Sequence, residues 1–311
     1  MTIERAHVRA SPKPWGVGDL RPWNDSDHQA GLVGELSFER EDDRSPDTSL
    51  LLKLLFTSAP VSIQVHPDDA YANSKGLPNG KSEAWYILSA TPEAQIALGV
   101  KQPATQQQLH RAIDDGSISD LVFWRPVKAG DVVSVPAGTI HAIGAGIVMA
   151  EIQQRSDVTY RLFDHGRGRP LDLDNARAAT KLSPVEFPAV QKRLTDQRTL
   201  LVANSHFVFE RIVLAANSNW RLDAERETCL FVLGGSMGAG ALSLARGDAV
   251  LAQSERLAVK AGRLGVECLV AYTGIGGPIL ELLQPLAEQT SPRRRYQAKA
   301  KAASSPNRPL Q

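Results

Sequence analysis

Short apolar runs separated by turn-forming residues recur along this chain. Residues 50–56 and 61–65 are mainly apolar and of strand length, and Ser58-Ala59-Pro60 interrupts them. Further runs of the same kind, each bounded by Gly, Pro, Ser or Asp, occupy residues 84–88, 95–100, 132–135, 147–152 and 159–163. Many short strands with such punctuation are typical of a barrel or a sandwich, so the sequence predicts a mainly β protein.

One stretch in this half departs from the strand pattern. Residues 105–114 are rich in Gln, Leu and Ala, begin at Thr105, which is a capping-type residue, and end near Gly116. These features predict a small helical insertion, which we expect on the outside of the β structure.

Strand-like runs return in the second half of the chain, at residues 206–214, 227–233, 249–251 and 267–272. Residues 172–190 contain prolines and lack a strand period, so we expect a connecting segment between two β domains, 1–171 and 191–289. Residues 290–311 carry basic side chains and little apolar surface, and we expect a disordered tail.

The balance of charged side chains limits the kinds of binding partner that we expect. The chain has 35 basic and 34 acidic side chains, and this formal net charge of +1 gives no field that favours nucleic acid or a membrane. A small polar ligand is the more natural partner, while the oligomeric state stays open.

Two further features predict a soluble, cytoplasmic protein. Cys229 and Cys268 are too few for a disulfide framework and fit buried thiols in a reducing cytosol. Residues 1–13 lack the apolar core of a signal peptide, and no later stretch reaches the about 18 apolar residues of a membrane span.

Four polar residues could hold a metal ion. Gln64 and His66 are two apart in a strand-like run, so both side chains point to the same face. Glu83 begins the next strand, and His141 closes the turn at residues 136–141. Two imidazoles, a carboxylate and an amide oxygen suit Zn²⁺ or another borderline divalent ion.

The surroundings of these residues resemble cupin motifs. Residues 130–141 have the pattern G-x5-P-x-G-x2-H and resemble the second cupin motif up to its histidine, although Ala145 replaces the usual asparagine. The usual H-x-H pair of the first motif is Gln64-Val65-His66 here, and the carboxylate lies farther downstream. The resemblance implies a cupin-type jelly-roll barrel, with the second half of the chain as a degenerate cupin-like domain.

Longer motifs resemble the class I mannose-6-phosphate isomerases in their short bacterial form. In order along the chain they are Lys13-Pro14-Trp15-Gly16, Gly34-Glu35, residues 62–69 (SIQVHPDD), residues 80–83 (GKSE) and residues 151–161 (EIQQRSDVTYR). The resemblance implies a zinc-dependent aldose-ketose isomerase that interconverts mannose 6-phosphate and fructose 6-phosphate through an enediol. It also implies one Zn²⁺ per chain, with Gln64, His66, Glu83 and His141 as ligands.

The same resemblance assigns roles to residues beside the metal. Arg161 matches the family's active-site arginine and suits a sugar oxyanion or a phosphate. Glu151, on the strand after His141, could shuttle a proton, and Lys81 could donate one or bind an oxyanion. Asp157 could orient Arg161 through a charge-assisted hydrogen bond.

Trp15 and Glu35 are further candidates, by analogy, for shaping the substrate mouth. Two other functions stay open at this point. Two histidines and one carboxylate also form the facial triad of non-haem iron oxygenases. A non-catalytic sugar-binding module is the other alternative, since a fold alone does not establish activity. The exact sugar, with or without phosphate, also stays open.

Overall fold

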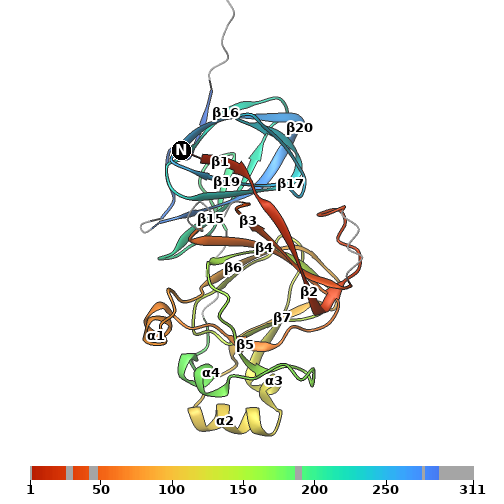
Figure 1. The fold of residues 1–311 in the computed structure, drawn as a ribbon, viewed down its shortest axis with the longest axis vertical. Coiled ribbons are helices and arrows are strands. Elements are labelled where there is room, and N and C mark those ends of the chain that lie inside the picture. Colours follow the sequence, from red (N-terminus) through yellow and green to blue (C-terminus); the bar gives the residue numbers. More distant parts are fainter. Residues whose placement is uncertain (1, 26–30, 42–47, 186–190, 275–276, 287–311) are drawn as a thin grey trace, which may run out of the picture.

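The structure is a computed structural model that describes residues 2–25, 31–41, 48–185, 191–274 and 277–286. It consists mainly of antiparallel strands, with four short helices among these residues. Two β units lie one above the other along the long axis of the molecule, and the helices gather at the far end of one of them (Figure 1). The mainly β class predicted from the apolar runs is confirmed.

The first β unit contains two sheets with an apolar interior between them. The six-stranded sheet has the order β2 (His7–Val17), β3 (Val33–Glu39), β4 (Leu50–Thr57), β11 (Ile147–Gln154), β6 (Glu83–Ala90) and β9 (Val132–Val135). The five-stranded sheet has the order β12 (Tyr160–Phe163), β5 (Ile63–Val65), β10 (His141–Ile143), β7 (Gln95–Val100) and β8 (Val122–Pro126). Trp85 and Ile87 of the first sheet share one buried cluster with Ile96 and Ile143 of the second.

The central strands of the six-stranded sheet are covered on both faces, as β4 illustrates. Side chains alternate between the two faces of a strand. Leu52 and Leu54 belong to a buried cluster that also contains Phe231 of the second β unit, so this face packs against that unit. Lys53 and Leu55 line a cavity on the opposite face, inside the first unit. A strand with two covered faces needs a nearly continuous apolar run, which is the pattern that predicted it.

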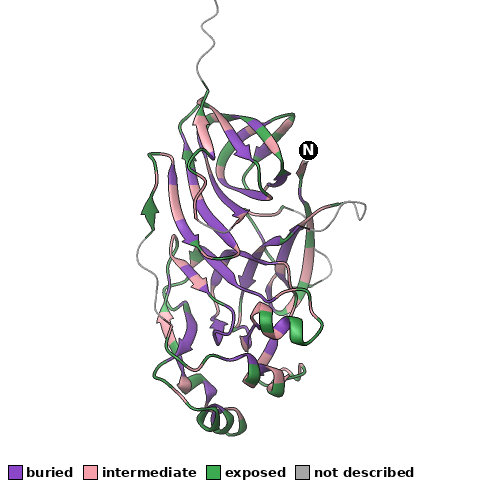
Figure 2. Ribbon diagram, turned by 90° about the vertical axis from the view of Figure 1, so that its left-hand side faces the viewer, coloured by how far each residue is buried: buried purple, intermediate pink, exposed green. Residues whose placement is uncertain are grey.

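The second β unit is one ten-stranded sheet. Its main path has the order β1 (Thr2–Arg5), β19 (Ala249–Gln253), β17 (Thr228–Ala239), β20 (Glu255–Thr273), β15 (Phe207–Leu214), β14 (Arg198–Ala203) and β13 (Lys192–Arg193). Three more strands attach to this path: β16 (Asn219–Ala224), β18 (Leu242–Ala245) and β21 (Leu283–Pro285). Buried residues run through the strands of both units, whereas the helices and outer loops are largely exposed (Figure 2).

The predicted helical insertion is confirmed as α2 (Gln106–Asp114). Thr105 is its N-cap, and the Thr105 hydroxyl and the Gln108 side chain form a reciprocal capping box. Leu109 and Ala112 are buried in the cluster that covers the outer face of the five-stranded sheet. The helices α1 (Asp69–Ser74), α3 (Ile118–Leu121) and α4 (Leu173–Ala179) were not predicted, because segments this short show no helical period.

The described residues place the N-terminal strand in the sheet of the second unit. Residues Thr2–Arg5 pair with β19, and the chain then crosses into the six-stranded sheet through β2. The domain limits at 171 and 191 stay a prediction, and α4 lies within the predicted connecting segment. Residues 186–190 of that segment and the predicted tail at 290–311 lie outside the described residues.

Candidate metal centre and active-site cavity

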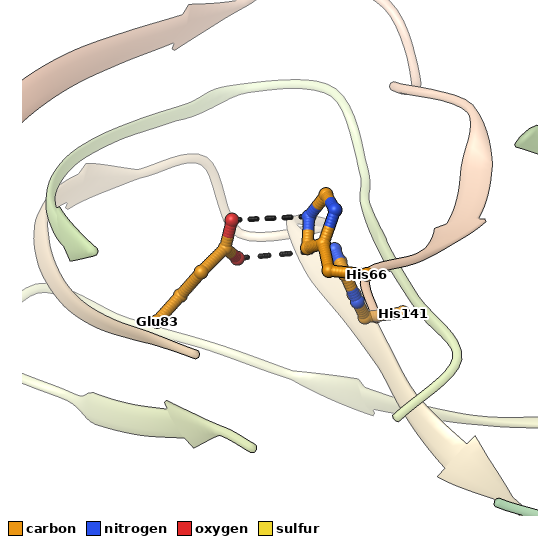
Figure 3. A group of neighbouring side chains, drawn as sticks. All are labelled: His66, Glu83 and His141. Atoms are coloured by element: carbon orange, nitrogen blue, oxygen red, sulfur yellow. Dashed lines mark ion pairs between the residues drawn. The ribbon is translucent and has the colours of Figure 1, made fainter. Parts of the chain in front are cut away.

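Two facing sheets bring the three candidate metal-binding residues together. His66 follows β5 and His141 begins β10, and these two strands pair with Gln64 opposite His141. Glu83 begins β6 in the six-stranded sheet. Figure 3 shows the carboxylate of Glu83 pointing toward both imidazoles. One ligand atom from each of the three side chains lies within 4.8 Å of the others.

Backbone carbonyls fix the orientation of both imidazoles. His66 Nδ1 lies 2.7 Å from the carbonyl oxygen of Val158, and His141 Nδ1 lies 2.9 Å from that of Thr139. A carbonyl only accepts, so each Nδ1 donates a hydrogen and each Nε2 keeps its lone pair. His66 Nε2 is 3.1 Å from Glu83 Oε1, and His141 Nε2 is 3.8 Å from Glu83 Oε2. Both free lone pairs therefore face the carboxylate.

Burial sets the protonation of this group. It lowers the pKa of His66 to about 3 and also lowers the pKa of His141 below its usual range. Burial opposes ionisation of Glu83, but Lys81 and His66 outweigh it and hold the pKa of that carboxyl well below its ordinary value. Two neutral imidazoles and one carboxylate are a donor set that suits a divalent metal ion, so this buried group could hold one.

Gln64 lies at the edge of the group. Its Oε1 accepts a hydrogen bond from the Ser62 hydroxyl at 2.9 Å, and its Nε2 lies 3.2 Å from His141 Nε2. In this orientation the amide presents nitrogen to the three ligand atoms. A half-turn about its last side-chain bond would present the oxygen instead.

Lys81 places a positive charge beside the same carboxylate. Its Nζ lies 2.5 Å from Glu83 Oε1, 3.4 Å from His66 Nε2 and 4.0 Å from Glu151 Oε1. Burial opposes this charge, but Glu83 and Glu151 outweigh it and raise the pKa of Lys81 above its ordinary value. Lys81 is therefore a buried cation that can donate hydrogen bonds into the cavity.

Glu151 is a buried carboxyl with an altered acidity. It lies on β11 directly opposite Trp85 of β6. The Trp85 indole N–H lies 3.1 Å from Glu151 Oε2 and 3.2 Å from Glu83 Oε2, so it can donate to either carboxylate. Burial, reinforced by the charge of Glu83, raises the pKa of Glu151 to about 7. This carboxyl can take up or release a proton near neutral pH.

A cavity of about 660 Å³ opens in front of these groups. Eight of the ten residues predicted for the site line it, namely Gln64, Lys81, Glu83, Glu151, Asp157, Arg161, Trp15 and Glu35. The other two, His66 and His141, lie behind the lining, beside Glu83, and are each 1% exposed. The structure therefore brings the whole predicted set to one place.

Arg161 lies on β12, and its Nε is buried without a hydrogen-bond partner in the described part of the chain. Burial and the neighbouring Arg169 lower its pKa. Asp157 does not have the contact expected for it: its carboxylate is 3.6 Å from Lys53 Nζ, and no hydrogen bond joins it to Arg161 among the described residues. The side chain of Asp157 is 93% exposed, so solvent competes with any such bond.

Three polar residues of the cavity wall are notable among those that sequence reasoning missed. Trp85 connects the two carboxylates, and Lys53 and Arg169 add positive charge. Lys53 had a visible signal, because it is the single charged residue in the apolar run of β4. Arg169, which pairs with Asp164 outside any regular element, had no such signal.

The comparison with protein-family models gave no match. Among curated proteins, the mannose-6-phosphate isomerase ManA of Bacillus subtilis is 38% identical over 174 residues, which are 54% of this chain and 52% of that protein. The mannose-6-phosphate isomerase of Streptococcus mutans is 42% identical over 133 residues, which are 41% of this chain and 42% of that protein. The chain thus spans about half the length of the curated relatives it matches.

Solved structures match over a longer part of the chain. The mannose 6-phosphate isomerase of Bacillus subtilis has a TM-score of 0.76 at 24% identity and covers 88% of this chain and 100% of its own. A variant of the phosphomannose isomerase of Salmonella typhimurium has a TM-score of 0.69 at 14% identity, over 88% and 100%. The resemblance to mannose-6-phosphate isomerases and the cupin-like fold are confirmed.

Within the described residues, no helix is both long and apolar enough to span a membrane.

Proposed function

We propose that this chain is a metal-dependent aldose-ketose isomerase that interconverts mannose 6-phosphate and fructose 6-phosphate. One observation carries the proposal: a buried His66, Glu83 and His141 group shares a cavity with Glu151, a carboxyl whose pKa lies at about 7. The names of the sequence relatives point to the same reaction. They do not favour the oxygenase or the non-catalytic sugar-binding module.

The reaction requires a base that returns the proton it takes. In the open-chain aldose, a base removes the proton from C2, and the resulting enediol receives a proton at C1 while a hydroxyl proton moves from O2 to O1. No atom is gained or lost. Glu151 suits this role because a group with a pKa near the working pH exchanges protons efficiently in both directions.

His66, Glu83 and His141 would hold the metal ion, with Gln64 as a further ligand, and we propose one zinc ion per chain. When bound, the ion supplies Lewis acidity that favours negative charge on the sugar oxygens. Both imidazoles already present unprotonated Nε2 atoms, so binding does not require their deprotonation at neutral pH.

The cationic side chains of the cavity suit the remainder of the substrate. Lys81 donates hydrogen bonds at the inner end, where a sugar oxygen would develop charge. Arg161 offers a guanidinium whose buried Nε has no partner in the described residues, and a phosphate or sugar oxyanion could supply one. Trp15 and Glu35 line the same cavity and would shape its mouth.

We also propose that the protein works in the cytoplasm. Cys229 and Cys268 are both buried as free thiols, which is the state expected in a reducing compartment.

A coupled assay that follows fructose 6-phosphate formation from mannose 6-phosphate tests the function. The zinc-loaded protein should convert mannose 6-phosphate, and chelator-treated protein should not. Arg161→Ala should lose about 100-fold in kcat/KM, because a charged hydrogen-bonding partner of the substrate is gone. Arg177→Ala is the matched control, since Arg177 lies on α4 outside the cavity lining. Absence of turnover by protein with bound zinc would refute the substrate assignment.

A further inference from the structure

The segment that carries Lys81 and Glu83 into the cavity has little regular structure of its own. Residues 75–82 form turns and loops between α1 and β6. The backbone N–H groups of residues 75–77 bond to the end of α1, and near Lys81 one backbone bond, from Lys81 N to the carbonyl oxygen of Pro67 at 3.0 Å, joins the loop to the preceding chain. Glu83 is paired in the sheet with Gln153 and Val135, whereas Lys81 depends on a loop that other groups must fix in place.

The Asp69 carboxylate makes the first of the contacts that fix this loop. Asp69 is the first residue of α1, and its Oδ1 accepts hydrogen bonds from Gly80 N at 2.8 Å and from Gln154 Nε2 at 3.0 Å. Burial opposes ionisation of Asp69, but the bonds from Gly80 and Gln154 outweigh it and lower the pKa of the carboxyl. Asp69 is therefore a carboxylate at neutral pH.

Gln154, which is bonded to Asp69, fixes the backbone on the other side of Lys81. Its side-chain Oε1 accepts a hydrogen bond from Ser82 N at 2.9 Å, and its own backbone N donates to the Ser82 carbonyl oxygen at 3.1 Å. Gln154 ends β11, the strand that also carries Glu151. The backbone N–H groups of Gly80 and Ser82, on either side of Lys81, are thus bonded to one connected pair, Asp69 and Gln154.

Gly80 shows how closely this loop lies on the chain beneath it. A Cβ atom at Gly80 would lie 2.5 Å from the carbonyl oxygen of Pro67 and 2.7 Å from Asp69 N. Both are backbone atoms, which cannot move aside as a flexible side chain can. Close approach of two backbones is therefore the reason for glycine at this position.

We propose that Asp69 is a positioning residue of the isomerase site: through Gly80 and Gln154 it fixes the backbone on both sides of Lys81, and so the direction in which Lys81 enters the cavity. The kinetic part of this inference rests on the proposed function. Displacement of catalytic groups by about 1 Å costs on the order of 100-fold in rate, so a link of this kind has a measurable effect.

His206 of the second β unit lies near the same carboxylate. Its Nδ1 is 3.8 Å from Asp69 Oδ2, which is too long for a hydrogen bond. The positioning link therefore runs through Oδ1 and does not need the imidazole. His206→Ala should leave kcat within about threefold of the wild type, since side chains without a hydrogen bond to the loop do not fix it.

Steady-state kinetics of three variants of the zinc-loaded protein test the link. Asp69→Ala should lower kcat by about 100-fold with little change in KM. Asp69→Asn should keep most of the activity, because an amide oxygen can accept the same two hydrogen bonds. Asp68→Ala is the matched control: the Asp68 side chain caps α1 by accepting from Tyr71 N, and among the described residues it has no hydrogen bond to the loop. It should lower stability and leave kcat unchanged.

Amide hydrogen exchange of the metal-free protein gives a second readout that does not depend on activity. Asp69→Ala should speed exchange at Gly80 and Ser82, whereas Asp68→Ala should not. Gly80→Ala, which forces the loop off residues 67–69, should reproduce the loss of kcat if Asp69→Ala fails to fold. Unchanged exchange together with wild-type kcat in folded Asp69→Ala would overturn the inference, as would an Asp69→Asn variant as slow as Asp69→Ala. An inactive wild type would refute the proposed function, and the exchange result would still decide the positioning role.

Discussion

Burial shifts the pKa values of two residues at this site in opposite directions. It moves the pKa of the Glu151 carboxyl up to about 7 and the pKa of the His66 imidazole down to about 3. Both shifts favour the neutral form, which is the general effect of removing water. The result is a group that could hold a metal ion, with free nitrogen lone pairs, beside a carboxyl whose pKa lies at about 7.

The raised pKa of Glu151 makes a prediction about stability. A carboxyl with a folded-state pKa of about 7, against 4.5 in an unfolded chain, stabilises the fold below pH 4.5 and loses that contribution as pH rises through 7. The change is at most ~3 kcal/mol. Glu151→Gln cannot titrate, so its stability relative to the wild type should increase between pH 5 and pH 8.

Urea unfolding of the two metal-free proteins at several pH values measures this difference. Glu93→Gln is a suitable control, because Glu93 is exposed and lies outside the cavity. A stability difference between Glu151→Gln and the wild type that stays constant over the whole pH range would show that Glu151 has an ordinary pKa.

Motifs made much of the candidate site predictable at the level of residues. His66, Glu83 and His141 are far apart in sequence, and the motifs around them that resemble those of cupins and mannose-6-phosphate isomerases implied that they meet. The positioning role of Asp69 could not be predicted, because it depends on a loop eleven residues away folding back onto α1. Contacts of this kind leave no periodic signal in a sequence.

At the level of elements, prediction succeeded where a buried strand left a short apolar run in the sequence or where a helix began at a clear N-cap residue. β9 has the predicted limits, and α2 begins immediately after the predicted cap Thr105. β20 runs from Glu255 to Thr273, whereas only 267–272 was predicted, because its first half alternates exposed and buried residues rather than forming an apolar run. β2 was missed because its prolines argue against a strand, but it lies at a sheet edge, where proline is tolerated.

The capping box of α2 can be tested separately from function. Thr105→Ala removes the acceptor for Gln108 N and should cost ~1 kcal/mol of stability in chemical denaturation. The proposed isomerase activity should not change, since α2 covers the outer face of the five-stranded sheet, away from the cavity. Thr105→Ser keeps the hydroxyl and should be nearly neutral. A large loss of activity in Thr105→Ala would mean that this insertion takes part in catalysis.

At the level of the whole molecule, the two β units share a buried cluster. Phe231 of β17 contacts Phe38 of β3, with ring centroids 5.4 Å apart, and Trp23, with centroids 5.8 Å apart. The N-terminal strand β1 also joins the sheet of the second unit. Apolar runs revealed strands in both units, but not that the outer face of one sheet is the surface on which the other unit packs.

This shared cluster predicts that the two units unfold together. Phe231→Ala should cost ~3–5 kcal/mol, because it empties a fully buried ring position between them. Thermal unfolding followed by calorimetry should show one transition at a lower temperature. Phe123→Ala is the control, since Phe123 is 39% exposed. Two separate transitions in the wild-type protein would contradict a common core.

The most direct test of the central claim is NMR of mannose 6-phosphate incubated with the zinc-loaded protein in D₂O. We expect fructose 6-phosphate with deuterium at C1, because a carboxylate that carries the proton between carbons exchanges it with solvent. The Glu151→Gln variant, with zinc still bound, should form product at about one hundredth of the wild-type rate or below. Wild-type protein that holds zinc and forms no fructose 6-phosphate, or a Glu151→Gln variant as fast as the wild type, would contradict the account.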